Sequence, residues 1–237
     1  MLLCVTGVLI ATEVIVTVVW QEPFSALSAK RAQNALSEKL AERERAWAGA
    51  STLAGVRRGR KAEMALRARA LERRTPIGEP LGRISIPKIG ARFVFVSGTG
   101  AGSLEKGPGH YRDTVLPGQT GSVGIAGHRT THLAPFRGLD RLRRGDLLIL
   151  KMPYGVFTYR TEGSSVVPPS DARPLRRVNG AHLALTTCTP LFSAAKRLVV
   201  TGRLVSAVPI ERVRRRQSPA PSGPRDWRKL SYWPAAA

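Results

Sequence analysis

The stretch HLALTTCTP, residues 182–190, is the most informative part of the sequence. It is an apolar run with β-branched residues, which predicts a strand, and it ends at the thiol of Cys188. A strand end holds a side chain rigidly while one side stays open. We therefore interpret Cys188 as a candidate nucleophile. The competing interpretation is a buried structural cysteine, the commoner state of an isolated thiol.

Two further apolar runs carry the remaining chemistry. SVGIAG, residues 122–127, leads directly into His128 and Arg129, and RLVVTGRLV, residues 197–205, begins with Arg197. Each run predicts a strand with a functional side chain at its edge. One thiol, one imidazole and one guanidinium are the groups that acyl transfer through a thioester requires.

Each of the three groups suits a particular role. A thiol attacks a carbonyl carbon as the thiolate, and a neighbouring imidazole can lower its pKa and hand a proton to the leaving amine. His128 can do both. An oxyanion needs a fixed donor, and the guanidinium of Arg197 is permanently charged and presents several N–H groups. Taken alone, His128 could be an ordinary hydrogen-bonded histidine and Arg197 a surface charge.

The middle of the chain predicts an all-β fold. From Gly82 onward, short alternating or apolar segments are set off by glycine and proline, which is typical of a barrel or sandwich. We expect seven or eight strands in a closed sheet. PFRGLDRL, residues 135–142, predicts a short helical turn. The seven located strands are 83–86, 92–96, 122–126, 146–151, 156–161, 183–187 and 198–205.

The flanking segments differ from this domain in composition. Residues 23–75 are rich in Ala, Leu, Glu, Lys and Arg, with no proline from residue 24 to residue 75, and predict an exposed basic helical stalk. Its heptad pattern is too broken to predict a coiled coil. The tail 209–237 is basic and proline-rich, and we expect it to be disordered. The domain prediction is thus an anchor over 1–22, a stalk over 23–75, a catalytic domain over 76–208 and this tail.

Residues 2–20, LLCVTGVLIATEVIVTVVW, are long enough to cross a hydrocarbon layer of about 30 Å as a helix. Glu13 is unfavourable there. A cleaved signal peptide is the alternative, but no basic region precedes the run and no small-residue cleavage site follows it. Lys30 and Arg31 follow the span, so the positive-inside rule alone would keep the rest of the chain inside.

Charge and cysteine usage limit the partners. The formal net charge of +22 suits nucleic acid, anionic lipid or a cell-wall polymer. No zinc-finger spacing, aromatic stacking motif or phosphate loop supports nucleic acid, so the arginines predict solvated faces and tails. Cys4 and Cys188 lie at opposite ends of the chain, which excludes a disulfide framework.

Several motifs together resemble the sortases, the cysteine transpeptidases that attach proteins to the walls of Gram-positive bacteria. They are IPKIG (86–90), SGT (97–99), KGPGHY (106–111), PGQ (117–119), AGHRTTHLAPF (126–136) and LTTCTP (185–190). The resemblance extends over residues 76–208 and is greatest to the class E sortases of actinobacteria. It implies an eight-stranded closed β-barrel, preceded by a transmembrane helix and stalk, with the catalytic domain on the extracellular side of the cell membrane.

The resemblance also implies the activity and its residues. Cys188 would attack the Thr–Gly bond of a Leu-Ala-x-Thr-Gly sorting signal on a secreted protein. His128 would protonate the leaving amine, Arg197 would hold the carbonyl oxygen, and lipid II or a pilin lysine would resolve the thioester. Tyr111, Thr130 and Thr187 are the candidate substrate-binding residues, although Tyr111 could equally pack on the barrel as a loop aromatic. No cofactor is expected.

Some features depart from the pattern or compete with it. Ser122 stands where an asparagine is usual, and Leu133 replaces an expected glycine, so the loop around His128 should differ in shape. His110 and His132 are rival imidazoles, but only His128 directly ends an apolar run, and His182 is interpreted as a solvent-facing residue at the start of the cysteine strand. The acidic residues Asp140, Asp146, Glu162 and Asp171 are scattered, so the sequence predicts no metal site.

Two alternatives remain open. An L,D-transpeptidase would place His-Gly directly before its nucleophile, where this chain has Thr186 and Thr187. A catalytically silent membrane-tethered adaptor could instead bind wall polymers or anionic lipid through the basic stalk and tail. Replacement of Cys188 by alanine separates the adaptor from an enzyme.

Overall fold

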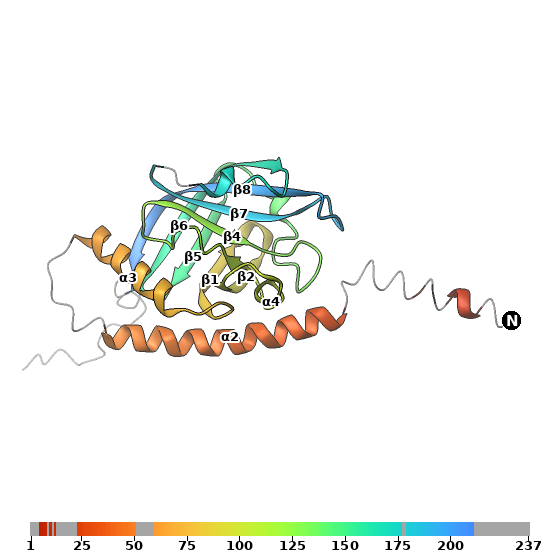
Figure 1. Cartoon of the computed structure of the whole chain (residues 1–237), viewed down its shortest axis with the longest axis horizontal. Coiled ribbons are helices and arrows are strands. Elements are labelled where there is room, and N and C mark those ends of the chain that lie inside the picture. The colour runs from red at the N-terminus through yellow and green to blue at the C-terminus, as the bar shows by residue number, and fades with distance from the viewer. Residues whose placement is uncertain are drawn as a thin grey trace, which may run out of the picture.

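The computed structural model describes residues 5–8, 10, 12, 23–50, 59–176 and 179–210. Its centre is a closed barrel of eight strands with helices packed on the outside (Figure 1). In chain order the elements are α2 (Pro23–Ala50), α3 (Arg60–Arg74), β1 (Pro80–Ile86), η2 (Pro87–Ile89), β2 (Ala91–Ser97), α4 (Ala101–Leu104), β3 (Gly109–His110), β4 (Gly121–Ala126), η3 (Leu139–Arg141), β5 (Leu147–Met152), β6 (Gly155–Val167), η4 (Arg173–Leu175), β7 (Ala181–Thr189) and β8 (Lys196–Pro209).

The strand order is β1-β2-β3-β4-β7-β8-β6-β5, and β5 pairs with β1 to close the barrel. Most pairs are antiparallel, but β4 and β7 run parallel, as do β2 and β3. The closed eight-stranded barrel predicted from the sequence is confirmed. All seven predicted strands are present, whereas the two-residue β3 was missed because it is too short to carry an alternating pattern.

The barrel interior is a single core of large apolar side chains. Phe95, Phe157 and Tyr159 are fully buried there, together with residues such as Leu148 and Leu185. Strand alternation sends every second side chain inward. The outward side chains of the same strands are therefore free to meet helices, loops or solvent.

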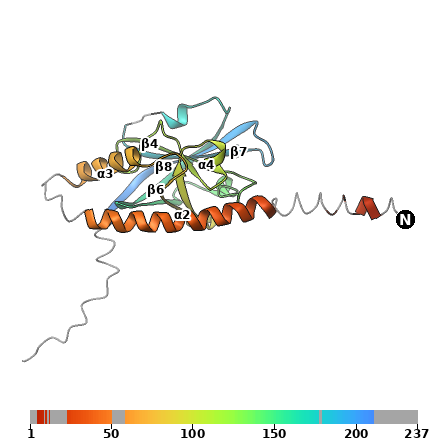
Figure 2. The ribbon, with the colours of Figure 1, turned by 60° about the horizontal axis from the view of Figure 1, so that its bottom comes forward.

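The predicted stalk is helical, but it is not exposed. Leu36 and Leu40 of α2 form a buried cluster with Val94 and Val96 on the outer face of β2. From α3, Met64, Ala68 and Leu71 join the barrel core cluster. The apolar stripe of these helices is narrow, but it is wide enough for a helix that needs to cover only one sheet face. The correction is that both helices pack on the barrel (Figures 1 and 2).

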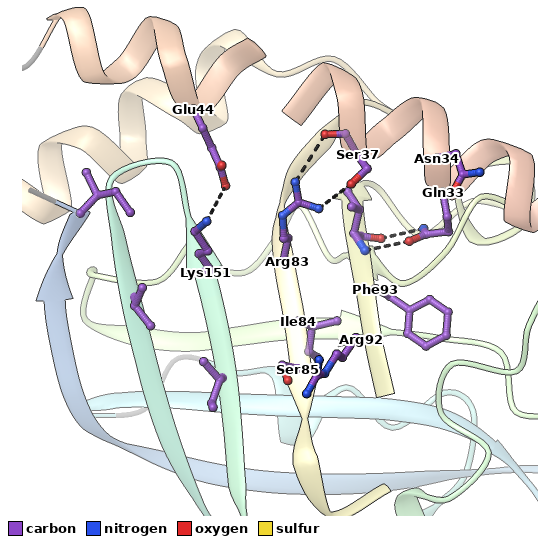
Figure 3. A pocket seen from close by; sticks show the side chains of 14 residues that line it. Gln33, Asn34, Ser37, Glu44, Arg83, Ile84, Ser85, Arg92, Phe93 and Lys151 are labelled. Atoms are coloured by element: carbon purple, nitrogen blue, oxygen red, sulfur yellow. Dashed lines mark hydrogen bonds and ion pairs between the residues drawn. The ribbon is translucent and has the colours of Figure 1, made fainter. Parts of the chain in front are cut away.

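Polar contacts fix α2 on the barrel, as Figure 3 shows. Gln33 accepts a hydrogen bond from the Val94 amide (2.8 Å) and donates one to the Val94 carbonyl (2.9 Å). Arg83 donates to Ser37 Oγ at 2.7 Å, and Lys151 lies 3.5 Å from a Glu44 carboxylate oxygen. A cavity of about 690 Å³ remains between the helix and this sheet face.

The two ends of the chain lie largely outside this description. Where the structure describes the chain, no helix is both long and apolar enough to cross a membrane. Most of the predicted anchor over 1–22 falls outside the described residues, and so does the predicted tail after Ile210.

Candidate active site

Strand β7 presents Cys188 on the outer face of the barrel. Leu183 and Leu185 belong to the core and are fully buried, so alternation places Thr186 and Cys188 on the opposite, outward face. Cys188 is a free thiol and is partly exposed, unlike the buried residues before it on the strand. The thiol is therefore accessible.

The parallel pairing of β4 with β7 brings His128 to the thiol. The register aligns Ala126 with Thr186, and the Gly127 amide donates to the Thr186 carbonyl at 3.0 Å, which continues the ladder past the end of β4. His128 therefore lies level with Cys188 at the ends of neighbouring strands. Because Val123 and Ile125 point into the core, the same alternation directs His128 outward.

Antiparallel pairing supplies the guanidinium. Cys188 lies directly opposite Arg197 in the β7–β8 ladder. Side chains of directly opposed residues stand on the same face, with Cβ atoms about 4.5–5.5 Å apart. Nη1 of Arg197 donates to the carbonyls of Ala194 (3.0 Å) and Lys196 (3.2 Å), which rests the guanidinium on the β7–β8 connection. Among the described residues, the remaining N–H groups of its fork make no hydrogen bond.

His128 has a second imidazole beside it. The rings of His128 and His132 stack with centroids 4.8 Å apart and an interplanar angle of 26°. The pKa of His128 is lowered by burial and then by His132, while Glu105 acts in the opposite direction. The neutral form of His128 is therefore favoured near pH 7 more strongly than in a free histidine.

The other two imidazoles have structural contacts. His110 is 1% exposed, and its Nε2 lies 3.2 Å from the Val115 carbonyl. Burial lowers the pKa of His110 to about 4. His182, at the start of β7, lies 3.4 Å from a Glu162 carboxylate oxygen. Neither residue lies at the strand ends that carry Cys188 and His128.

The three predicted substrate-binding residues have different positions. The Tyr111 hydroxyl lies 2.9 Å from Thr186 Oγ1, on the outward face that carries Cys188. Thr130 is partly exposed in the segment after His128. Thr187 is the exception, because it is 3% exposed and its hydroxyl donates to the Gly127 carbonyl at 2.7 Å. Alternation directs Thr187 away from the thiol, and its hydrogen bond ties β7 to the residue that follows β4.

Arg129 holds several segments around Cys188 together, a role that the sequence analysis did not assign to it. It is 7% exposed, and its Nη1 donates to Thr189 Oγ1 (2.8 Å) and lies 3.4 Å from the Cys188 carbonyl. Its Nη2 lies 3.2 Å from Asp140 Oδ2. One guanidinium thus joins the segment after His128, the end of β7 and η3. Its position directly after His128 was the only signal in the sequence.

The loop after His128 has an unusual backbone. His132, Leu133 and Ala134 all have positive φ values, of 49°, 65° and 42°. Leu133 thus occupies a left-handed conformation that favours glycine, the residue that the resemblance led us to expect there. Among the described residues, no group of three or more His, Cys, Asp or Glu side chains is arranged to hold a metal ion.

Comparisons with known proteins agree with this arrangement. A family model described as the sortase domain matches residues 84–205, just over half of the chain. The chain is 38% identical over 133 residues to Sortase D of Bacillus subtilis (strain 168) and 31% identical over 150 residues to Sortase SrtE1 of Streptomyces coelicolor. These alignments cover 54% and 56% of this chain, and 66% and 42% of the relatives. The chain therefore spans less than two thirds of their length.

Solved structures show the same barrel. Sortase E1 from Streptomyces coelicolor, crystallised with a tripeptide in its active site, matches with a TM-score of 0.55 and 29% identity, covering 60% of this chain and 95% of that one. Sortase E from Streptomyces avermitilis matches with a TM-score of 0.53 and 34% identity, over 58% and 95%. The family model, the curated relatives and the barrel all lead to one conclusion: the chain belongs to the sortase family.

Proposed function

We propose that this chain is a membrane-anchored cysteine transpeptidase of class E type. It cleaves a Leu-Ala-x-Thr-Gly sorting signal between Thr and Gly and transfers the acyl group to an amine of a cell-wall precursor or a pilin lysine. The observation that supports the proposal is the strand register: β7 lies between β4 and β8, Ala126 pairs with Thr186 two residues before His128 and Cys188, and Cys188 pairs with Arg197. Cys188, His128 and Arg197, with Tyr111 and Thr130 as substrate contacts, form the proposed site.

The first step forms the thioester. The Cys188 thiolate adds to the Thr carbonyl carbon, and the developing oxyanion meets the free N–H groups of Arg197. When the intermediate collapses, the C–N bond breaks and the imidazolium of His128 gives its proton to the departing Gly amine. The partly exposed positions of the three side chains let an extended peptide reach them.

The second step releases the acyl group. An acceptor amine adds to the thioester carbonyl, neutral His128 takes the proton that the amine loses, and the C–S bond breaks to return the Cys188 thiolate. Because the pKa of His128 is lowered by burial and by His132, the neutral base that this step needs is abundant near pH 7. The imidazolium needed in the first step is correspondingly scarce.

The class assignment rests on the motifs and on the class E relatives. Sortase D of Bacillus subtilis, at 38% identity, supports a sortase of class D type as a second candidate. The second residue of the signal separates the two. The hydrogen bond between Tyr111 and Thr186 holds Tyr111 on the outward face of the barrel. We propose that Tyr111 contacts the second residue of the sorting signal.

The proposed location follows from the sequence. Residues 2–20 would anchor the chain in the cell membrane, with the barrel outside and secreted signal-bearing proteins as partners. The start of α2 and the β7–β8 connection lie at the same end of the molecule in both views (Figures 1 and 2). An anchor preceding α2 would therefore hold the site close to the membrane surface.

Mass spectrometry of the full chain incubated with a Leu-Ala-x-Thr-Gly peptide tests the proposal. We expect a mass increase on Cys188 equal to the acyl fragment and release of the glycine-terminated fragment. The Cys188→Ala variant should show neither. An adduct with a Leu-Pro peptide alone would keep the transpeptidase and reject the class E signal. No adduct with either peptide would favour the silent adaptor.

A further inference from the structure

The connection between β7 and β8 is an apolar segment that faces solvent. Residues 190–195 have the sequence PLFSAA, so five of the six are apolar and none is charged. All of them except Ser193 are exposed, and the exposed fractions of Leu191 and Phe192 are 42% and 66%. Single exposed apolar residues are ordinary on a protein surface, whereas a continuous run of them marks a contact site. We call residues 190–195 the apolar loop.

The backbone of the apolar loop is suited to surroundings that are poor in water. Pro190 has no N–H, the Ser193 amide donates to the Pro190 carbonyl (3.2 Å), and the Ala195 amide donates to Ser193 Oγ (3.2 Å). Arg197 donates to the Ala194 carbonyl at 3.0 Å. Because unsatisfied backbone groups are costly where water is scarce, these internal hydrogen bonds make the loop easier to bury in a partner.

Phe192 has a backbone conformation that does not favour its residue type. Its φ is 63°, in the left-handed region where glycine is preferred over any residue with a Cβ atom. The residue is 66% exposed, so packing within the described part of the chain does not compensate for this strain. A strained and exposed aromatic residue at the tip of a loop points to contact with a partner.

The position of the apolar loop indicates which partner. The loop and the start of α2 lie at the same end of the molecule in both views (Figures 1 and 2). From Pro23 toward the N-terminus the chain continues into the apolar run 2–20, the proposed membrane anchor. Leu27, near the start of α2, is 50% exposed and adds apolar surface at this end. An anchor that precedes α2 therefore brings the membrane to the end of the molecule that carries the loop.

The charges of the two segments favour an anionic surface. The sequence has no acidic residue from Ala172 to Ile210, a range that contains the apolar loop, and none from Pro23 to Ser37 in the first half of α2. Lys30 of α2 and Lys196 directly after the loop are both exposed. Basic side chains beside an apolar surface are typical of segments that bind at the interface of an anionic membrane.

We propose that the apolar loop is a membrane-contact site, in which Leu191 and Phe192 enter the interface of an anionic bilayer. Lys30 and Lys196 lie among the lipid phosphate groups, with their aliphatic stems on the apolar surface. The assignment rests on the membrane anchor of the proposed function and adds a second contact to it. Phe192 follows Cys188 by four residues, so the contact fixes the height of the thiol above the bilayer.

Photocrosslinking at the tip of the loop tests the assignment in the full chain. The chain carries the photoreactive residue p-benzoylphenylalanine at position 192 and is reconstituted into vesicles of phosphatidylglycerol and phosphatidylcholine. After irradiation, mass spectrometry of proteolytic fragments counts the lipid adducts. We expect lipid adducts on the fragment that contains position 192, because this side chain lies in the interface.

Position 66 provides the matched control. Leu66 is an exposed apolar residue of α3, which lies toward the other end of the molecule in both views (Figures 1 and 2). A helix as long as α2 spans about 40 Å, far more than the thickness of a lipid interface, so p-benzoylphenylalanine at position 66 should give about tenfold fewer lipid adducts. Equal labelling at the two positions, or no labelling at position 192 in a chain that floats with the vesicles, would overturn the assignment.

Two further measurements separate this assignment from the proposed function. If the chain does not float with the vesicles, the membrane location and the loop contact are both overturned. If the unaltered chain in vesicles forms no thioester on Cys188 with the sorting-signal peptide, the transpeptidase is rejected, and the lipid adducts still decide the loop contact. Adducts between position 192 and the peptide in place of lipid would make the loop a substrate contact and overturn the membrane assignment.

Discussion

The barrel has two outer faces that differ in how far they are covered. The face of β1, β2 and β5 lies under α2, where Gln33, Ser37 and Glu44 occupy its polar groups. The face of β4, β7 and β8 is covered only in part and stays open where Cys188 and Arg197 stand. A covered face fixes its polar groups in permanent contacts, whereas an open face keeps them available for substrate. Four predictions test this division.

The largest effect is expected at the open face. Cys188→Ala should reduce peptide cleavage by more than about a thousandfold, because no other described cysteine can form the thioester. Its urea unfolding curve should match that of the unaltered chain, since the thiol is partly exposed. Residual cleavage close to the unaltered rate would show that Cys188 is not the nucleophile.

The covered face should respond in stability instead. Leu40 is fully buried in the cluster with Leu36, Val94 and Val96. Leu40→Ala should lower the free energy of unfolding by about 3 to 4 kcal/mol through lost burial and a cavity. Leu27→Ala on the same helix changes a half-exposed side chain and serves as the control. If both variants unfold alike, α2 does not stabilise the barrel. The thioester yield of the folded Leu40→Ala protein should be unchanged.

The next largest effect is a loss of stability at low pH, caused by the buried imidazole of His110. The pKa of His110 is about 4 in the folded chain and ordinary, near 6.5, in the unfolded chain. Protonation therefore favours unfolding, and this term lowers stability progressively as the pH falls from about 6.5 to 4, by about 3 kcal/mol in total. Urea unfolding at several pH values should show the loss, and His110→Gln should flatten it. The same slope in both proteins would exclude His110 as the cause.

The smallest effect is expected from a variant that alters the position of His128 relative to Cys188 on the open face. Arg129→Gln removes the link between the segment after His128 and the end of β7, and should lower kcat by about tenfold to a hundredfold with little change in KM. Arg129→Lys should restore part of the rate because it keeps the charge next to Asp140. Equal losses with Gln and Lys, or a change confined to KM, would argue against a positioning role.

The sequence predicted well where its signals were local and periodic. The seven strands and the short helical turn within residues 135–142 could be located because each buried run alternates or is bounded by glycine and proline. The catalytic roles of Cys188, His128 and Arg197 were inferred from strand ends and from family motifs, and they stay predictions. The stalk was misjudged as exposed because a charged helix with a narrow apolar stripe has the same pattern in solvent and on a barrel.

What the sequence determined by itself is the set of elements and the chemistry they carry, because side-chain periodicity and residue type are properties of the chain. The tertiary structure alone decided which groups meet. The β4–β7 and β7–β8 registers set the neighbours of Cys188, buried Arg129 connects three segments, and Thr187 is directed away from the thiol. These outcomes depend on pairings between segments far apart in the chain, and periodicity within one segment does not encode its register with another.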